Sequence, residues 1–570
     1  MKVKKIYSVL CAAVCVCGFA ACDKNTSEQA ETATAASVHV ISSGQTTVTE
    51  ASTSESETEQ TTIETEPLSV YDESCSAKIT RFAISADNEY MISPIEYEIN
   101  QENKTIAVNI TYENYADIHT LQNCIVDIEI ENGEYAFDMT NPDGTADLTR
   151  LTEIVVTDEN GTKNKYDVIT ERTVFDLPIV NVYLENLTDQ SNIGRDEYIP
   201  MTFFIDNTGA DEYGAGTDVL TGKIRGRGHS TWKWEKKPYR IKLDEKTSVL
   251  GLGENKDWVL LANYSDKAML RNITAYSMSR SLDGMDWNPT QYPVDLFVNG
   301  IYRGVYTIGE HMEAAESRVN IETGSSEADT GYLLEVGGDD EGDVKGKDYF
   351  HTEQKLAKFI KIKSPDTDEM TESQMEFIVD YINKTEEAIV SGIGYEEYID
   401  VDSFCDWIII HELSYNSDCC FRRSCYLNKD KGGKLKLGPV WDFDLAFGNC
   451  NKDNQNYDDW VTVGESYKDA YVQVNWCNYL MENESFRSRL RERWFEVRDA
   501  LVEEAMSCID YYGAKLERSQ IKNYEAWNVW GKKTGYQSWH NLEFDITYND
   551  QIQYLKDFIT KRAEWIDENI

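Results

Sequence analysis

The segment ELSYNSDCCFRRSCYLNKDKGGKLKLGPVWDFDLAFGN (residues 412–449) places one aspartate before a predicted β-hairpin and two just after it. Asp418 precedes the strand-like residues 424–427, a turn rich in Lys and Gly follows, and Asp442 comes directly after a second strand-like run, residues 434–440. A phosphoryl transferase needs one carboxylate to accept the proton of the attacking hydroxyl and another to hold the magnesium that bridges the nucleotide phosphates. Because a hairpin fixes the distance between the residues at its two ends, this order predicts a phosphoryl-transfer site.

Asp444 adds a second acidic residue after the hairpin. The sequence Asp442-Phe443-Asp444 is close to the Asp-Phe-Gly of protein kinases. The alternative is that each aspartate only caps a turn, which is a common structural role for this residue type.

Residues 225–231 (RGRGHST) have the composition of a phosphate-binding loop. The two glycines allow a backbone to approach phosphate closely, and Arg225 and Arg227 add charge-assisted donors. A turn between two strands would explain the same glycines equally well.

Residues 236–243 (KKPYRIKL) alternate as a strand does, with Arg240 and Lys242 on one face. Lys242 is a candidate for the strand lysine that contacts nucleotide phosphates in kinases. Lys237 is the alternative candidate for that role.

Taken together, these blocks resemble the CotH (spore coat protein H) kinase family. The resemblance also includes LG (250–251), DWVLLAN (257–263), NGIYRGVY (299–306) and VWDFD (440–444), in family order from about residue 177 to the C-terminus. The family is similar to protein kinases in fold, and some members phosphorylate serine on other proteins with ATP and a divalent metal.

The resemblance implies a role for each candidate site residue. It implies Asp418 as the catalytic aspartate, Asp442 as a ligand of Mg²⁺ or Mn²⁺, and Asp444 as a carboxylate that supports this site or binds a second metal ion. Asn416 is our own candidate for a further metal ligand. The residues implied in cofactor binding are Arg225, Arg227, Lys237, Lys242, Arg271 and Glu310.

Arg423 is a departure from the kinase pattern, which has a metal-binding asparagine five residues after the catalytic aspartate. Asn416 and Asn449 are the candidate substitutes. A positive charge at this position opposes a second magnesium, so an inactive kinase-like surface scaffold remains the alternative to an enzyme.

The apolar pattern predicts an α+β chain with two folded parts. Residues 71–175 have the short alternating runs and turn signals of a small all-β immunoglobulin-like sandwich, a spacer or adhesive module. Residues 176–570 have strands first and helical spacing later, as in a two-lobed, atypical protein-kinase-like domain. The predicted strands of this second part are 179–183, 217–225, 239–243, 258–261 and the two strands of a hairpin at 295–308, and its predicted helices are 267–282, 373–389, 401–413, 484–506 and 550–569.

The N-terminus predicts a lipoprotein of the cell surface. Residues 1–22 have the basic start and apolar core of a signal peptide, and they end in small residues before Cys22, the expected lipidation site. Residues 23–70 are rich in Ser, Thr and Glu and predict a disordered linker. We therefore expect a chain on the extracellular face of the membrane, attached through its lipid anchor only.

The formal net charge of −46 argues against nucleic-acid binding, since a polyanion needs a basic surface. Cys75 and Cys124 are a candidate disulfide of the first folded part. Tryptophans near the C-terminus leave a carbohydrate contact open, although helical packing explains them better.

The function predicted from these features is an extracytoplasmic transferase. It would move a phosphoryl group from ATP to Ser or Thr hydroxyls of surface or secreted proteins, with Mg²⁺ or Mn²⁺ at the phosphates. The scaffold alternative would bind a protein or carbohydrate partner, and a hydrolase is the third option.

Overall fold

The computed structural model describes most of the chain from residue 71 onward. The described residues are 71–84, 95–112, 114–137, 141, 144–172, 176–185, 193–207, 210–214, 216–338, 342–357, 359–419, 421–449, 458–463, 474–532, 534 and 547–570. The predicted signal peptide, Cys22 and the predicted linker lie outside them. No helix in these ranges has the length and apolar character needed to cross a bilayer.

The first folded part is an all-β module with one short helix, α1 (Ile118–Gln122). Its larger sheet has the order β2 (Glu96–Asn100), β3 (Thr105–Ile110), β7 (Lys163–Arg172), β6 (Thr152–Asp158) and β5 (Gly133–Phe137), and its smaller sheet pairs β1 (Lys78–Ile84) with β4 (Val126–Glu131). Strands β3 and β7 run parallel, and the other pairs are antiparallel. Alternate residues of β3 and β6 are buried, so each strand gives one face to the core.

Cys75 and Cys124 are free cysteines, so the candidate disulfide between them is not formed. Each thiol is close to a different backbone carbonyl: the Cys75 Sγ lies 3.1 Å from the Thr162 oxygen, and the Cys124 Sγ lies 3.1 Å from the Thr120 oxygen. The two thiols therefore lie in separate local environments.

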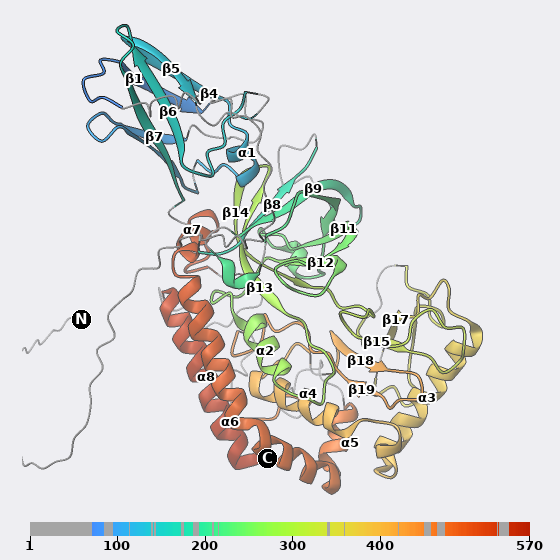
Figure 1. Cartoon of the computed structure of the whole chain (residues 1–570). Coiled ribbons are helices and arrows are strands. Elements are labelled where there is room, and N and C mark those ends of the chain that lie inside the picture. Colours follow the sequence, from blue (N-terminus) through green and yellow to red (C-terminus); the bar gives the residue numbers. More distant parts are fainter. Residues whose placement is uncertain are drawn as a thin grey trace, which may run out of the picture. The chain divides into compact units, whose positions relative to one another are not determined.

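The next part is a closed barrel of seven strands (Figure 1). The order is β10 (Leu220–Gly226), β11 (Tyr239–Thr247), β12 (Asn255–Leu261), β14 (Ile301–Glu310), β13 (Gln291–Val298), β8 (Ile179–Tyr183) and β9 (Ile199–Asp206). Strands β13 and β14 form the predicted hairpin, and Asn299 and Gly300 at its turn have φ of 48° and 70°. Large side chains such as Tyr239, Trp258 and Tyr306 fill the barrel.

The helical lobe contains the second large sheet and most helices. The sheet order is β16 (Tyr349–Phe350), β17 (Ile360–Ser364), β15 (Tyr332–Val336), β18 (Cys425–Lys429) and β19 (Lys436–Leu437). The helices are α2 (Arg271–Arg280), α3 (Glu372–Ser391), α4 (Val401–Ser414), α5 (Trp476–Glu482), α6 (Glu484–Lys515), α7 (Ser519–Ala526) and α8 (Tyr548–Asn569). Helices α2, α4 and α8 pack against the long helix α6 (Figure 1).

The end of α4 matters for the site because the chain continues from it to Asp418. Tyr415 adopts a left-handed conformation, with φ of 47°, and this ends the helix. The buried Glu412 carboxylate of the last turn pairs with Arg562 of α8 at 2.7 Å and accepts the backbone N–H of Val461 and of Thr462. These contacts hold the start of the loop in place.

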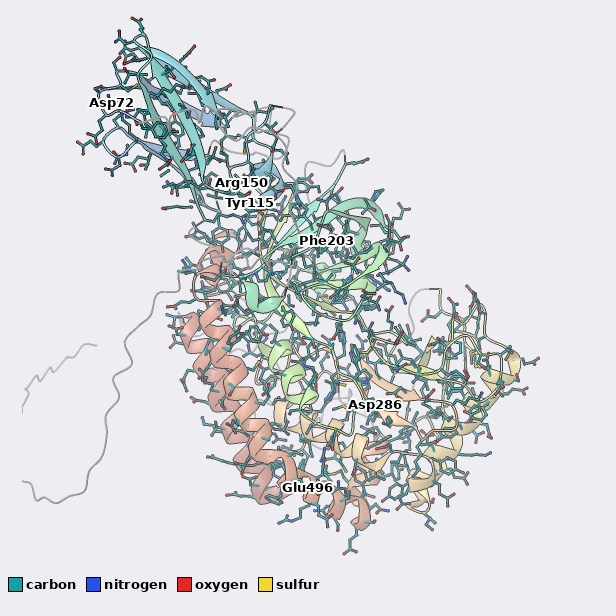
Figure 2. The ribbon with its side chains drawn as sticks, in the orientation of Figure 1. Asp72, Tyr115, Arg150, Phe203, Asp286 and Glu496 are labelled. Carbon is teal, nitrogen blue, oxygen red and sulfur yellow. The ribbon has the colours of Figure 1, made fainter. Side chains whose placement is uncertain are left out.

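Buried hydrogen bonds join the all-β module to the barrel. The Tyr112 hydroxyl donates to the Asp295 carboxylate of β13 at 2.8 Å and lies 3.0 Å from the hydroxyl of Ser519 on α7. Tyr115, which lies where the module meets the barrel (Figure 2), donates to Asn181 of β8 at 3.0 Å. The module is therefore in polar contact with the strand that carries Asp295.

Candidate active site

A cavity of about 720 Å³ lies where the barrel meets the helical lobe. Its lining on the barrel side includes Arg227, Gly228, Lys236 and Ser265. Its lining on the other side includes α2 and the residues on both sides of the β18–β19 hairpin, namely Ser417, Asp418, Arg422, Arg423, Ser424, Trp441, Asp442 and Asp444. The volume is in the range of sites that hold a small organic ligand.

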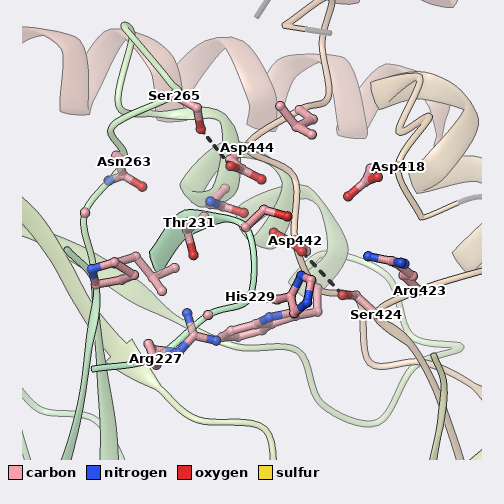
Figure 3. A pocket seen from close by; sticks show the side chains of 18 of the residues that line it. Arg227, His229, Thr231, Asn263, Ser265, Asp418, Arg423, Ser424, Asp442 and Asp444 are labelled. Carbon is pink, nitrogen blue, oxygen red and sulfur yellow. Dashed lines mark hydrogen bonds between the residues drawn. The ribbon is translucent and has the colours of Figure 1, made fainter. Parts of the chain in front are cut away.

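Asp442 is held in an uncommon backbone conformation, with φ of 71°. Its N–H donates to the Tyr276 hydroxyl at 3.3 Å, and its carbonyl accepts the Asn416 amide at 3.0 Å. The Ser424 hydroxyl donates to its carboxylate at 3.3 Å (Figure 3). Strained residues persist only where the surroundings hold them, and they are concentrated at functional sites.

Asp444 faces the same cavity two residues later. The Ser265 hydroxyl donates to its carboxylate at 2.7 Å (Figure 3). Phe443, between the two aspartates, is fully buried, and its N–H donates to Asn272 at 2.8 Å. The chain is therefore fixed on both sides of the pair.

The pKa values of both carboxylates are raised above the usual value of an aspartate. Burial is the main cause that raises the pKa of Asp442 well above its usual value, and repulsion by Asp444 and Asp418 adds to it, while Arg227 opposes the shift. Burial also raises the pKa of Asp444, and its hydrogen bond from Ser265 lowers it. Crowded, partly buried carboxylates of this kind favour a bound cation.

The donor set fits a kinase-type magnesium site rather than an all-protein one. The described residues contain no group of three or more His, Cys, Asp or Glu side chains arranged to hold a metal ion. Magnesium at kinase sites is held by one or two carboxylates together with substrate phosphates and water, so two aspartates suffice. Asp442 and Asp444 would be the protein ligands.

Asp418 lines the cavity in the loop between α4 and β18. Arg422 donates to its carboxylate at 2.9 Å and to its backbone carbonyl at 3.1 Å. Figure 3 shows Asp418 across the cavity from Asp442 and Asp444. An acid held in this way can accept a proton from a hydroxyl that reaches the cavity.

On the barrel side, the loop after β10 supplies Arg227 and Gly228. The Arg227 guanidinium lies 5.7 Å from the ring centre of Trp441, and burial lowers its pKa while Asp442 opposes that shift. Gly228 has φ of 82°, and an added Cβ would lie 2.0 Å from the Thr231 hydroxyl. This position therefore requires glycine.

Three of the predicted cofactor-binding residues do not line the cavity. Arg225 donates to the Arg195 carbonyl at 3.1 Å, and Lys237 donates to the Trp232 carbonyl at 2.7 Å. Lys242 faces outward from the barrel, 3.7 Å from Asp257.

The remaining predicted residues are buried elsewhere. Arg271 forms a fully buried ion pair with Asp266, and Glu310 pairs with Arg318 at 2.6 Å. Asn416 is buried beneath Asp442 and donates to its carbonyl, so it supports the backbone beside the cavity. The structure therefore brings together Arg227, Asp418, Asp442 and Asp444 from the predicted set.

Lys236 and Ser265 line the cavity but were not predicted from the sequence. Lys236 donates to the Val305 carbonyl and, at 2.8 Å, to Asn523 of α7. Burial lowers the pKa of Lys236 well below its usual value, and Asp295 opposes the shift. The only sequence signal was the adjacent Lys-Lys pair before Pro238.

Comparison with known proteins identifies a family over most of the barrel and helical lobe. Residues 224–566 match the family described as CotH kinase protein. No curated protein matches the chain.

Two crystal structures from Bacteroides species are similar over part of the chain. A Bacteroides fragilis protein assigned as secreted is 20% identical over 17% of this chain and 95% of its own, with a TM-score of 0.13. A DUF4623 family protein from Bacteroides eggerthii is 11% identical over 31% of this chain and 49% of its own, also with a TM-score of 0.13. Neither likeness is strong enough to support an inference about fold or function.

Proposed function

This chain belongs to the CotH kinase family, and we propose that it transfers the γ-phosphoryl group of ATP to Ser or Thr hydroxyls of surface or secreted proteins. Family membership itself points to a kinase-like fold, to protein kinase activity and to ATP as the donor. The acceptor class, the metal and the residue roles are our proposal.

The observation that carries the proposal is the convergence of Asp418, Asp442, Asp444 and Arg227 on one cavity. Carboxylates that can hold a metal ion or take a proton, together with a cationic side chain, are the groups that phosphoryl transfer uses. Catalysis of this reaction is mostly positioning and charge stabilisation.

In the proposed reaction, Asp418 orients the acceptor hydroxyl and takes its proton. A bond forms between the hydroxyl oxygen and the γ-phosphorus, the bond from that phosphorus to the β–γ bridging oxygen breaks, and ADP leaves. Asp442 and Asp444 would hold Mg²⁺ or Mn²⁺, which supplies positive charge to the phosphates when bound. Arg227, with Lys236 when protonated, faces the phosphates from the barrel side.

We further propose that the chain is lipid-anchored at Cys22 on the extracellular face of the membrane. The signal-peptide pattern of residues 1–22 supports this location. It fits acceptors that are themselves at the cell surface.

Transfer from γ-labelled ATP to a Ser-rich protein, with the purified full chain and Mg²⁺ or Mn²⁺, tests the function. We expect Asp442→Asn and Asp418→Asn each to reduce the rate by about a hundredfold or more. Asp286→Asn is a matched control, because Asp286 is exposed and pairs with Lys436 outside the cavity lining.

Absence of transfer by the wild type, or equal transfer by Asp442→Asn, would refute an enzyme. The specific observation that favours a scaffold is Arg423 in the place of the kinase asparagine. A scaffold would be stabilised thermally by a protein or carbohydrate partner and not by Mg-ATP.

A further inference from the structure

We infer that the Arg423 guanidinium takes the place of the second divalent cation of protein kinases. In this arrangement Arg423 contacts the phosphoryl group that is transferred, and one divalent cation binds, at Asp442 and Asp444. The inference rests on the proposed function and specifies how its charge is arranged.

Arg423 occupies the right place for this role. It lines the cavity beside Ser424, whose hydroxyl donates to the Asp442 carboxylate. Figure 3 shows its side chain extending from the loop toward the space between Asp418 and Asp442. The backbone N–H groups of Arg422 and Arg423 both donate to the Cys419 carbonyl, at 2.7 and 3.3 Å, so the loop that presents the side chain is a hydrogen-bonded turn.

The two neighbouring arginines have different surroundings. The Arg422 guanidinium is already used, because it donates to the Asp418 carboxylate at 2.9 Å. The Arg423 side chain is exposed to the cavity, and within the described ranges its guanidinium forms no ion pair or side-chain hydrogen bond. Its positive charge is therefore available to an anionic ligand.

Two asparagines could have replaced the metal-binding asparagine of kinases, but the side-chain amides of both donate hydrogen bonds to backbone carbonyls. Asn416 donates its amide to the Asp442 carbonyl at 3.0 Å. Asn449 donates its amide to the Ser265 carbonyl at 2.9 Å and to the Asp444 carbonyl at 2.6 Å. Both are buried and neither lines the cavity, so both support the backbone of the acidic pair.

One divalent cation would balance the charges near the acidic pair. Arg422 compensates Asp418, and a single divalent cation would compensate Asp442 and Asp444. The positive charges of Arg423 and Arg227 would then be left to bind the phosphates. A guanidinium stays protonated and its planar donors match two phosphate oxygens, whereas a second metal ion beside it would meet a like charge.

The test counts Mn²⁺ bound by the full chain in the presence of a non-hydrolysable ATP analogue, from the electron paramagnetic resonance signal of free Mn²⁺. We expect one Mn²⁺ per bound analogue in the wild type and two in Arg423→Asn, which restores the kinase ligand. We also expect Arg423→Ala to lose about tenfold or more of the preference for the analogue over ADP. Arg423→Lys should keep part of that preference.

Arg487→Ala is the control, because Arg487 is an exposed arginine of α6 outside the cavity lining. Two Mn²⁺ per analogue in the wild type, or an unchanged preference in Arg423→Ala, would overturn the inference alone. Absence of any analogue binding by the wild type would overturn both the inference and the proposed function. Single Mn²⁺ binding without phosphoryl transfer would support the inference and count against the enzyme.

Discussion

Asp295 is predicted to make the stability of the barrel depend on pH. Its carboxylate is fully buried and accepts hydroxyl donors from Tyr112, Tyr302 and Ser519 at 2.8 to 2.9 Å. Burial raises its pKa from 3.8 to about 6, although the three donors and the nearby Lys236 oppose the shift. Between about pH 4 and pH 6, the folded protein therefore keeps a proton on Asp295 that the unfolded chain has already released.

The direction and size of the pH effect on the free energy of unfolding follow from this pKa shift. A raised pKa contributes stability that is fully present below about pH 4 and is lost as the pH rises through about 6. A difference of about two pH units corresponds to roughly 3 kcal/mol, since each unit is worth about 1.4 kcal/mol. Asp295→Asn resembles the protonated acid, so it should match the wild type near pH 4 and be more stable than it at pH 7 by up to about 3 kcal/mol.

Calorimetric unfolding of wild type and Asp295→Asn at pH 4, 5.5 and 7 measures this difference. The melting temperatures of the two should diverge by a few degrees as the pH rises. Asp286→Asn, at an exposed aspartate, should follow the wild type at every pH. If Asp295→Asn were less stable than the wild type at pH 7, the three hydroxyl donors would outweigh burial and the reasoning would be wrong.

Three further substitutions have definite expectations. Tyr112→Phe removes a donor to a buried carboxylate between the module and the barrel, and should lower the unfolding free energy by about 1.5 to 3 kcal/mol at pH 7 in a denaturant titration. Gly228→Ala forces a side chain onto a φ of 82° and against Thr231, so isothermal calorimetry should show nucleotide binding weakened at least tenfold, with no change if the loop does not contact the ligand. Arg562→Met leaves the buried Glu412 carboxylate without its ion-pair partner and should cost about 3 to 5 kcal/mol in the same denaturant titration, a loss that a surface pair would not show.

Asp418 and Asp442 could be predicted as cavity residues from the sequence because their placement around the hairpin is local. A short hairpin and the turn chemistry of residues 428–433 fix where Asp418 and Asp442 lie relative to β18 and β19. The predicted helices were also found, and helices α3 and α8 show the one-sided apolar pattern on which such a prediction depends. Strands such as β5, whose residues are nearly all exposed at a sheet edge, give no such pattern and were not predicted.

The position of Lys236 in the cavity could not be predicted from the sequence because it depends on residues that are distant in the chain. Alternation correctly places Arg240 and Lys242 on one face of β11, but only closure of the barrel makes that face the outer one. Lys236 becomes buried through Val305 and Asn523, which are 69 and 287 residues away in the chain. No local pattern contains that information.

Helix α7 links the buried acid to the cavity. Ser519 in its first turn donates to Asp295 at 2.9 Å, and Asn523, one turn later, accepts the ammonium of Lys236 at 2.8 Å. The negative charge of Asp295 favours the protonated form of Lys236, and a polyphosphate in the cavity would favour that form too. Because such coupling is reciprocal, bound nucleotide should lower the pKa of Asp295, and nucleotide affinity should rise as Asp295 ionises between about pH 5 and 7. In Asp295→Asn this rise should disappear, and an unchanged pH profile of nucleotide affinity in that variant would show that the acid and the cavity are independent.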